Sequence, residues 1–94
     1  MRTYEVMVIA QPDLDEQAIN ALVEKVKGWI TEKGGSVENV DNWGRRRMAY
    51  VIKKQREGQY ILITAKMEPS FTSELERNLR FIETVVRFMI TVVE

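Results

Sequence analysis

Six positively charged residues gather within twelve positions near the middle of the chain. The stretch WGRRRMAYVIKKQREGQY runs from Trp43 to Tyr60, and its only acidic residue is Glu57. The cations are Arg45, Arg46, Arg47, Lys53, Lys54 and Arg56. A guanidinium group can hold a phosphate through two hydrogen bonds and can stack on a flat ring. Arginines interleaved with aromatic residues suit folded RNA, which is recognised by its shape, its backbone and its unstacked bases.

The rest of the composition limits the chemistry that is available. The chain has 94 residues, with 14 basic and 14 acidic side chains, no cysteine and no histidine. Zero net charge argues against a wholly basic nucleic-acid binder, so any such contact must come from a local patch. The missing cysteine and histidine remove the commonest nucleophile, general base and metal ligands. We therefore expect no enzymatic activity, no cofactor and no metal site.

Hydrophobic periodicity predicts six elements that would position the cations. Alternating apolar residues predict strands, and a stripe at helical spacing between Asp13 and Gly34 predicts the first helix. The second helix begins at Pro69, with Ser70 as its expected cap. The predicted strands occupy residues 2–10, 36–54, 60–67 and 84–93. The stretch 55–59 is expected to form a hairpin turn, with Gly58 as its positive-φ residue.

The order β-α-β-β-α-β is that of a split β-α-β, ferredoxin-like fold of the α+β class. We expect one domain, residues 1–94, in which two helices cover one face of a four-stranded antiparallel sheet. The first and third strands would lie in the middle of this sheet. The cationic stretch would therefore occupy an edge strand and its hairpin.

The strand pattern also predicts which residues face away from the helices. Alternation assigns an apolar strip to this open face, bordered by cations. The strip consists of Met7, Ile9, Tyr60 and Leu62, and the bordering residues of the second strand are Arg45, Arg47, Val51 and Lys53. A contiguous exposed apolar strip usually meets a partner. Arg2 and Tyr4 could extend the basic patch along the first strand. The simpler interpretations are a solvated sheet and a charged edge that protects against aggregation.

The central motif resembles that of a known family, the sixth protein of the bacterial small ribosomal subunit. The family signature is a glycine, basic residues, an apolar residue, then Ala-Tyr, one further residue and Ile. It is matched by Gly44, Arg45, Arg46, Arg47, Met48, Ala49, Tyr50 and Ile52. The flanking segments MRTYEVMVI and LERNLRFIETVVRFMI extend the resemblance over essentially the whole chain.

The resemblance implies a structural, non-enzymatic protein of the small subunit, located on the ribosome in the cytoplasm. It implies binding to small-subunit ribosomal RNA in the platform region, together with the eighteenth small-subunit protein. The candidate contacts for RNA or for this protein partner are Arg2, Tyr4, Arg45, Arg46, Arg47, Lys53, Lys54 and Arg56. The apolar strip defined above is the candidate surface for the partner. No small-molecule substrate and no membrane association are expected.

The sequence differs from the family pattern at two places. Val51 stands where the family usually has proline, so an amide donor is restored to the edge strand. Many members have a charged or disordered tail after the last strand, whereas this sequence stops at Glu94, so contacts through a tail are either absent or were removed with a trimmed tail. Two other interpretations stay open. One is a ferredoxin-like adaptor that binds proteins and not RNA, and the other is a small-ligand sensor domain.

Overall fold

The computed structural model describes residues 1–52 and 54–93. Lys53, one of the expected contact residues, lies outside the described residues. The elements follow the predicted order: β1 (Arg2–Ala10), α1 (Glu16–Glu32), β2 (Ser36–Ile52), β3 (Gln55–Met67), a 3₁₀ turn (Pro69–Phe71), α2 (Thr72–Arg80) and β4 (Val85–Val92). The predicted ferredoxin-like order of strands and helices is confirmed.

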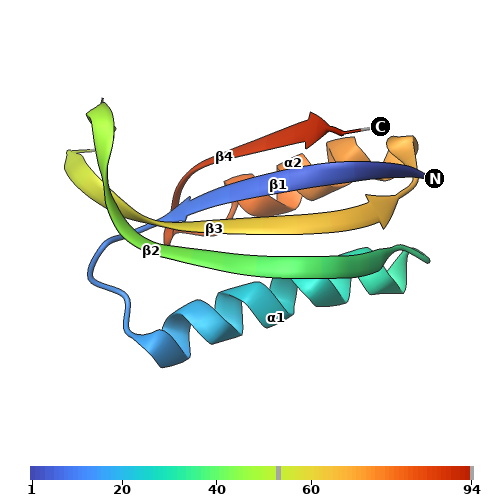
Figure 1. Cartoon of the computed structure of the whole chain (residues 1–94), viewed down its shortest axis with the longest axis horizontal. Coiled ribbons are helices and arrows are strands. Elements are labelled where there is room, and N and C mark those ends of the chain that lie inside the picture. The colour runs from blue at the N-terminus through green and yellow to red at the C-terminus, as the bar shows by residue number, and fades with distance from the viewer. Residues whose placement is uncertain (53, 94) are drawn as a thin grey trace.

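The four strands form one antiparallel sheet in the order β2-β3-β1-β4. β1 and β3 therefore lie in the centre, as predicted, and β2 and β4 form the edges. Figure 1 shows the long β2–β3 hairpin at one end of the sheet and the two chain termini at the other. The residues of the described helices that pack on the sheet join a single core on one face.

The main core lies between the helices and one face of the sheet. β1 contributes Val6 and Val8, and both are essentially inaccessible to solvent. Ile61 and Ile63 of β3 face the same side. They pack against residues of α1 and α2, namely Ile19, Leu22, Val26, Ile30, Leu75 and Leu79. Because side chains alternate along a strand, this burial confirms the predicted faces of β1 and β3.

The ring of Tyr4 belongs to this same core and is only 7% exposed. It has the strand parity of Val6 and Val8, so it points toward the helices and away from the open face. The expectation that Tyr4 extends an exposed patch is therefore wrong. A buried ring is unavailable for stacking on a base or on a partner.

The helix ends follow from local chemistry. Asp15 caps α1, because its Oδ1 accepts a hydrogen bond of 2.8 Å from the backbone N–H of Ala18. After α1, Gly34 has φ 82°, a left-handed conformation that glycine adopts at little cost. Pro69 opens the second helical segment as predicted, but Ser70 does not cap it. α2 follows a 3₁₀ turn and has no side-chain cap.

Three register shifts bend β2 away from a regular ladder with β3. They lie between Val37 and Asn39, between Asn42 and Gly44, and between Arg47 and Ile52. In the last of these, residues 48–51 of β2 lie opposite Arg56 alone. Extra residues on one strand bend it and increase its twist. The hairpin consequently curls at its tip, as Figure 1 shows for the ends of β2 and β3.

The hairpin turn lies earlier in the chain than the predicted stretch 55–59. Ile52 pairs with Gln55, and the positive-φ residue is Lys54, with φ 66°. Gly58 instead lies within β3 and is buried. A Cβ at Gly58 would meet Ile9 Cγ2 and would approach the carbonyl oxygen of Ala10 to 3.2 Å. Close approach of β1, and not the conformation of a turn, therefore explains this glycine.

Candidate functional site

The curled tip of the hairpin covers one end of the open face. There Met48 of β2 packs with Ile9 of β1 and Val86 of β4 in a second, small apolar cluster. Ile9 is only 9% exposed, so its expected exposure on the open face is wrong. Met7 and Tyr60 pack beside this cluster and are half-buried, as is Leu62. The predicted apolar strip therefore exists on the predicted face, but the hairpin shields part of it.

The bulge at Trp43 exchanges the two faces of β2 near the tip. Gly44 pairs with Tyr60 and Arg45 pairs with Gln59, so Arg45 points to the helix side. The hydrogen bonds agree, because Arg45 Nη2 donates to the carbonyl oxygen of Pro12, at 2.8 Å, in the segment between β1 and α1. The prediction that Arg45 and Arg47 border the open face is therefore wrong, whereas Val51 has no partner in the β2–β3 ladder. Met48 and Tyr50 of β2 occupy that face instead.

The described cations of the hairpin differ in how firmly the fold holds them. Arg45 donates to Pro12 and lies 3.8 Å from a carboxylate oxygen of Glu57. Arg46, Arg47, Lys54 and Arg56 are exposed, and no ion pair joins any of these four to a carboxylate of residues 1–52 and 54–93. Four positive charges are thus held close together on one bent hairpin. Such a patch attracts anions more strongly than the zero net charge suggests.

Arg2 does not extend this patch. It pairs with Met67 at the opposite end of β1, whereas the hairpin cations lie near the end where Ala10 pairs with Gln59. Eight residues of extended strand separate these ends, a span of about 27 Å at about 3.4 Å per residue. In Figure 1 the N-terminus and the hairpin tip lie at opposite ends of the molecule.

An aromatic stack lies at the base of the basic hairpin. The rings of Trp43 and Tyr60 are stacked, with their centroids 6.3 Å apart and their planes 3° from parallel. The guanidinium carbon of Arg46 lies 5.3 Å from the Trp43 ring centroid. Trp43 Nε1 donates to Asp41 Oδ2 at 3.1 Å, which fixes the indole. The hairpin therefore presents a cation and an exposed indole together, the combination that holds a phosphate and a base.

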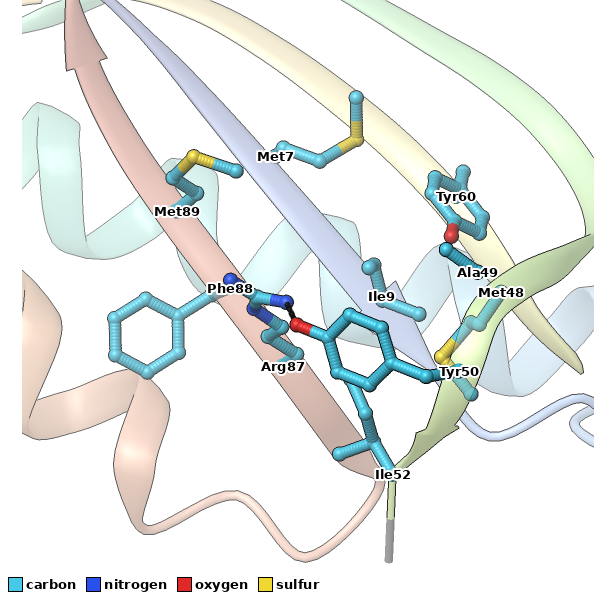
Figure 2. A pocket seen from close by; sticks show the side chains of 10 residues that line it. All are labelled: Met7, Ile9, Met48, Ala49, Tyr50, Ile52, Tyr60, Arg87, Phe88 and Met89. Carbon is cyan, nitrogen blue, oxygen red and sulfur yellow. Dashed lines mark hydrogen bonds between the residues drawn. The ribbon is translucent and has the colours of Figure 1, made fainter. Parts of the chain in front are cut away.

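An apolar pocket of about 250 Å³ opens between the hairpin tip and β4. Figure 2 shows its walls: Ile9 and Met7 from β1, Tyr60 from β3, Met48, Ala49, Tyr50 and Ile52 from β2, and Arg87, Phe88 and Met89 from β4. Arg87 Nη1 donates a 2.6 Å hydrogen bond to the Tyr50 hydroxyl across the mouth. The guanidinium carbon of Arg87 also lies 6.0 Å from the Tyr50 ring centroid. This contact joins the hairpin to the opposite edge strand.

Sequence reasoning missed the β4 residues of this pocket. Arg87 is the only charged residue in the described strand β4, VVRFMITV. A single charge in an otherwise uncharged strand was the signal in the sequence that could have pointed to this residue. Val86 and Arg87 both lie on the open face, because the β1–β4 register shifts beside Ile9 and Ala10. Simple alternation from Phe88 and Ile90 would place Val86 on their face, but the irregularity puts it on the open face instead.

Comparison with known proteins identifies the family. The model of the family described as ribosomal protein S6 matches residues 3–92. The chain belongs to the ribosomal protein S6 family. The S6 relative from Clostridium novyi is 52% identical over 90 residues, which cover 96% of this chain and 95% of the relative. The S6 relative from Moorella thermoacetica is 47% identical over 94 residues, covering 100% and 96%. Both relatives are called small ribosomal subunit protein bS6.

A solved structure supports the same conclusion for the fold. The crystal structure of 30S ribosomal protein S6 from Thermotoga maritima matches with a TM-score of 0.90 at 35% identity. The match covers 97% of this chain and 86% of that one. The resemblance found in the central motif is thus confirmed, and the chain is a structural, non-enzymatic protein of the small ribosomal subunit.

The described residues offer neither a cluster of metal ligands nor a helix that could span a membrane. Within residues 1–52 and 54–93, no three side chains of the metal-ligating types lie close enough together to hold an ion. No helix in that part of the chain is long and apolar enough to cross a membrane.

Proposed function

We propose that this S6-family protein binds small-subunit ribosomal RNA in the platform region, together with the eighteenth small-subunit protein. It would act on the ribosome in the cytoplasm. RNA would contact the exposed cations of the hairpin, and the protein partner would use the remaining open face. Family membership supports the small-subunit role, and the resemblance of the central motif supports the RNA site and the partner.

The stack of Arg46, Trp43 and Tyr60, on the same hairpin as the exposed Arg47 and Arg56, is the observation on which the RNA site rests. The cations can neutralise phosphates, while the exposed indole offers a flat surface to an unpaired base. Arg45 has a different role, because its guanidinium is hydrogen-bonded to the backbone of the β1–α1 segment. We therefore assign phosphate contacts to Arg46, Arg47 and Arg56, with Lys54 at the tip of the hairpin.

A salt titration of RNA binding tests this assignment. The triple variant Arg46→Ala, Arg47→Ala, Arg56→Ala should bind platform-region RNA more weakly, with the partner protein present. Each phosphate contact releases counterions and contributes about 0.9 to the log–log salt slope on a duplex, or about 0.7 on a single strand. The slope should therefore fall by roughly 2–3 if all three guanidinium groups touch phosphate.

The control removes the same charge from another surface. Lys25→Ala, Lys27→Ala, Lys33→Ala takes three cations from α1 and the residue that follows it, away from the hairpin. This control should keep the wild-type slope to within about 0.5, because charges more than a Debye length from the RNA are screened. If the hairpin variant keeps both the affinity and the slope of the wild type, the basic run is only a soluble edge. The protein-binding adaptor would then be the better interpretation.

A further inference from the structure

An exposed aromatic side chain lies at the end of α2, one of the two helices that cover the sheet (Figure 1). Phe81 is 80% exposed, the highest value for a large apolar side chain among the described residues. Its backbone is fixed, because the N–H of Phe81 donates to the carbonyl oxygen of Asn78 at 3.3 Å. The N–H of Ile82 likewise donates to the carbonyl oxygen of Leu79 at 3.2 Å. A structured helix end therefore holds this ring in solvent.

An apolar recess lies next to this ring, between α1 and the segment that joins α2 to β4. It has a volume of about 230 Å³ and is lined by Ala18, Ala21, Leu22, Lys25, Ile82 and Thr84. Two of these residues are alanines three positions apart, so they lie on one face of α1 and leave room above it. A cavity of about 150 Å³ is enough to hold a benzene ring, so the recess has room for a phenyl group.

Opposite charges accompany the ring and the recess. Lys25 lines the recess, and Glu83 lies two positions after Phe81, between two residues of the recess wall in the sequence. Both charged side chains are exposed, and no ion pair joins either of them to an opposite charge of residues 1–52 and 54–93. A molecule with an aromatic ring next to a carboxylate would match the recess in shape and in charge. The chain itself carries that combination.

We propose that this face binds a second copy of the same chain, with Phe81 of each copy seated in the recess of the other. A two-fold axis repeats every contact, so Glu83 of each copy would also lie near Lys25 of the other. Zero net charge favours this association, because highly charged chains repel one another. Two phenyl rings and two surface ion pairs make a small interface, so the dimer should be weak and reversible.

The inference goes beyond the proposed function, since it needs neither RNA nor another ribosomal protein. The recess lies between helix α1 and the segment before β4, whereas the basic residues lie on the β2–β3 hairpin. A dimer formed through this face would therefore leave the hairpin cations accessible.

The first test uses the wild-type chain, so no variant has to fold. Sedimentation equilibrium between about 10 µM and about 1 mM, the range in which a weak complex dissociates, should show a reversible dimer. Over the same dilution, amide NMR resonances of residues 18–25 and 81–84 should shift, while those of residues 43–60 should not. A chain that stays monomeric throughout would overturn the proposal. Shifts confined to the hairpin or to an edge strand would also overturn it, because they would indicate strand pairing.

A charge placed on the exposed ring tests its role. Phe81→Asp should raise the dissociation constant of the dimer at least tenfold, with an unchanged circular dichroism spectrum. Val92→Asp is the matched control, because it adds the same charge at a residue that is 47% exposed and does not line the recess. It should stay within twofold of the wild type, and equal effects of the two variants would overturn the assignment. Phe81→Asp should bind platform-region RNA as the wild type does, so failure of the dimer leaves the proposed function intact.

Charge reversal tests the proposed arrangement. Lys25→Glu and Glu83→Lys should each weaken the dimer several-fold, because each places like charges together at both contacts. The double variant restores both pairs with their signs exchanged and should return to within about twofold of the wild type. A residue that only supported the fold of its own chain would give no such rescue. A double variant as weak as the single variants would overturn the pairing of Lys25 with Glu83, and with it this dimer.

Discussion

The sheet has an apolar cluster on each face, and the two clusters are closed in different ways. On one face, two helices seal the main core, and Val6, Ile63 and Leu75 are almost completely buried. On the other face, a cluster of Ile9, Met48 and Val86 is covered only by the bent tip of the hairpin. Among the described residues, one side-chain hydrogen bond connects the hairpin tip to β4, and it joins Tyr50 to Arg87.

Because of this difference, we expect the helix-covered core to serve stability and the open-face cluster to serve recognition. A core sealed by helices supplies most of the hydrophobic free energy, which grows with the apolar area removed from water. A small cluster beside an open pocket supplies less, and it leaves apolar surface available for another molecule. The following four changes test how separate the two clusters are, from the largest expected effect to the smallest.

Leu75→Ala should lower the free energy of unfolding by roughly 2–5 kcal/mol, the usual cost of a large-to-small change in a closed core. Leu75 is fully buried in α2, and no solvent can fill the space that is left. Urea unfolding monitored by circular dichroism measures the loss. Leu75→Met is the control and should lose less than about 1.5 kcal/mol. A loss below about 1 kcal/mol for the alanine variant would mean that α2 contributes little to the core.

Met48→Ala should lower the free energy of unfolding by about 1–2 kcal/mol. The cluster around Met48 is small and opens into the pocket, so the hairpin tip can relax into the space more easily than the main core can. Amide hydrogen exchange should accelerate in the β2–β3 hairpin and stay slow in α1. A loss as large as that of Leu75→Ala would contradict the comparison, since it would show that the two clusters act as one core.

Tyr50→Phe should lower the protection of the hairpin by about 1 kcal/mol, because the Arg87 guanidinium loses its hydroxyl acceptor. That free energy corresponds to roughly fivefold faster amide exchange near the tip, through local opening. Global unfolding in urea should change little. Unchanged exchange in the hairpin would show that the apolar contacts alone hold the tip in place.

Arg46→Ala should change the free energy of unfolding by less than about 0.5 kcal/mol, as most exposed substitutions do. The guanidinium lies over an exposed indole, where a cation–π contact is worth little more than this. Urea unfolding measures the change, and Arg45→Ala provides the contrast, because it also removes the hydrogen bond to Pro12. A loss above about 1 kcal/mol at Arg46 would mean that this residue supports the fold.

Residues close together in the sequence determined much of this protein. Alternation in 2–10 and 60–67 predicted the helix-covered faces of β1 and β3, and Gly34 predicted the end of α1. The motif from Gly44 to Ile52 indicated the family. These features depend on local periodicity, on capping and on φ preferences, all of which short segments of chain express by themselves.

Only the tertiary structure determined how the hairpin bends and which residues lie on the open face. A bulge of one residue at Trp43 turned Arg45 and Arg47 to the helix side, and alternation cannot reveal such a slip. Residues 48–51 left the ladder, so the tip could bend over Ile9 and reach Arg87 on the far edge strand. The pocket is built from all four strands, and Tyr50 and Arg87, which close its mouth, are 37 positions apart. Contacts at that separation depend on the accumulated twist and register of the whole sheet, which no local pattern encodes.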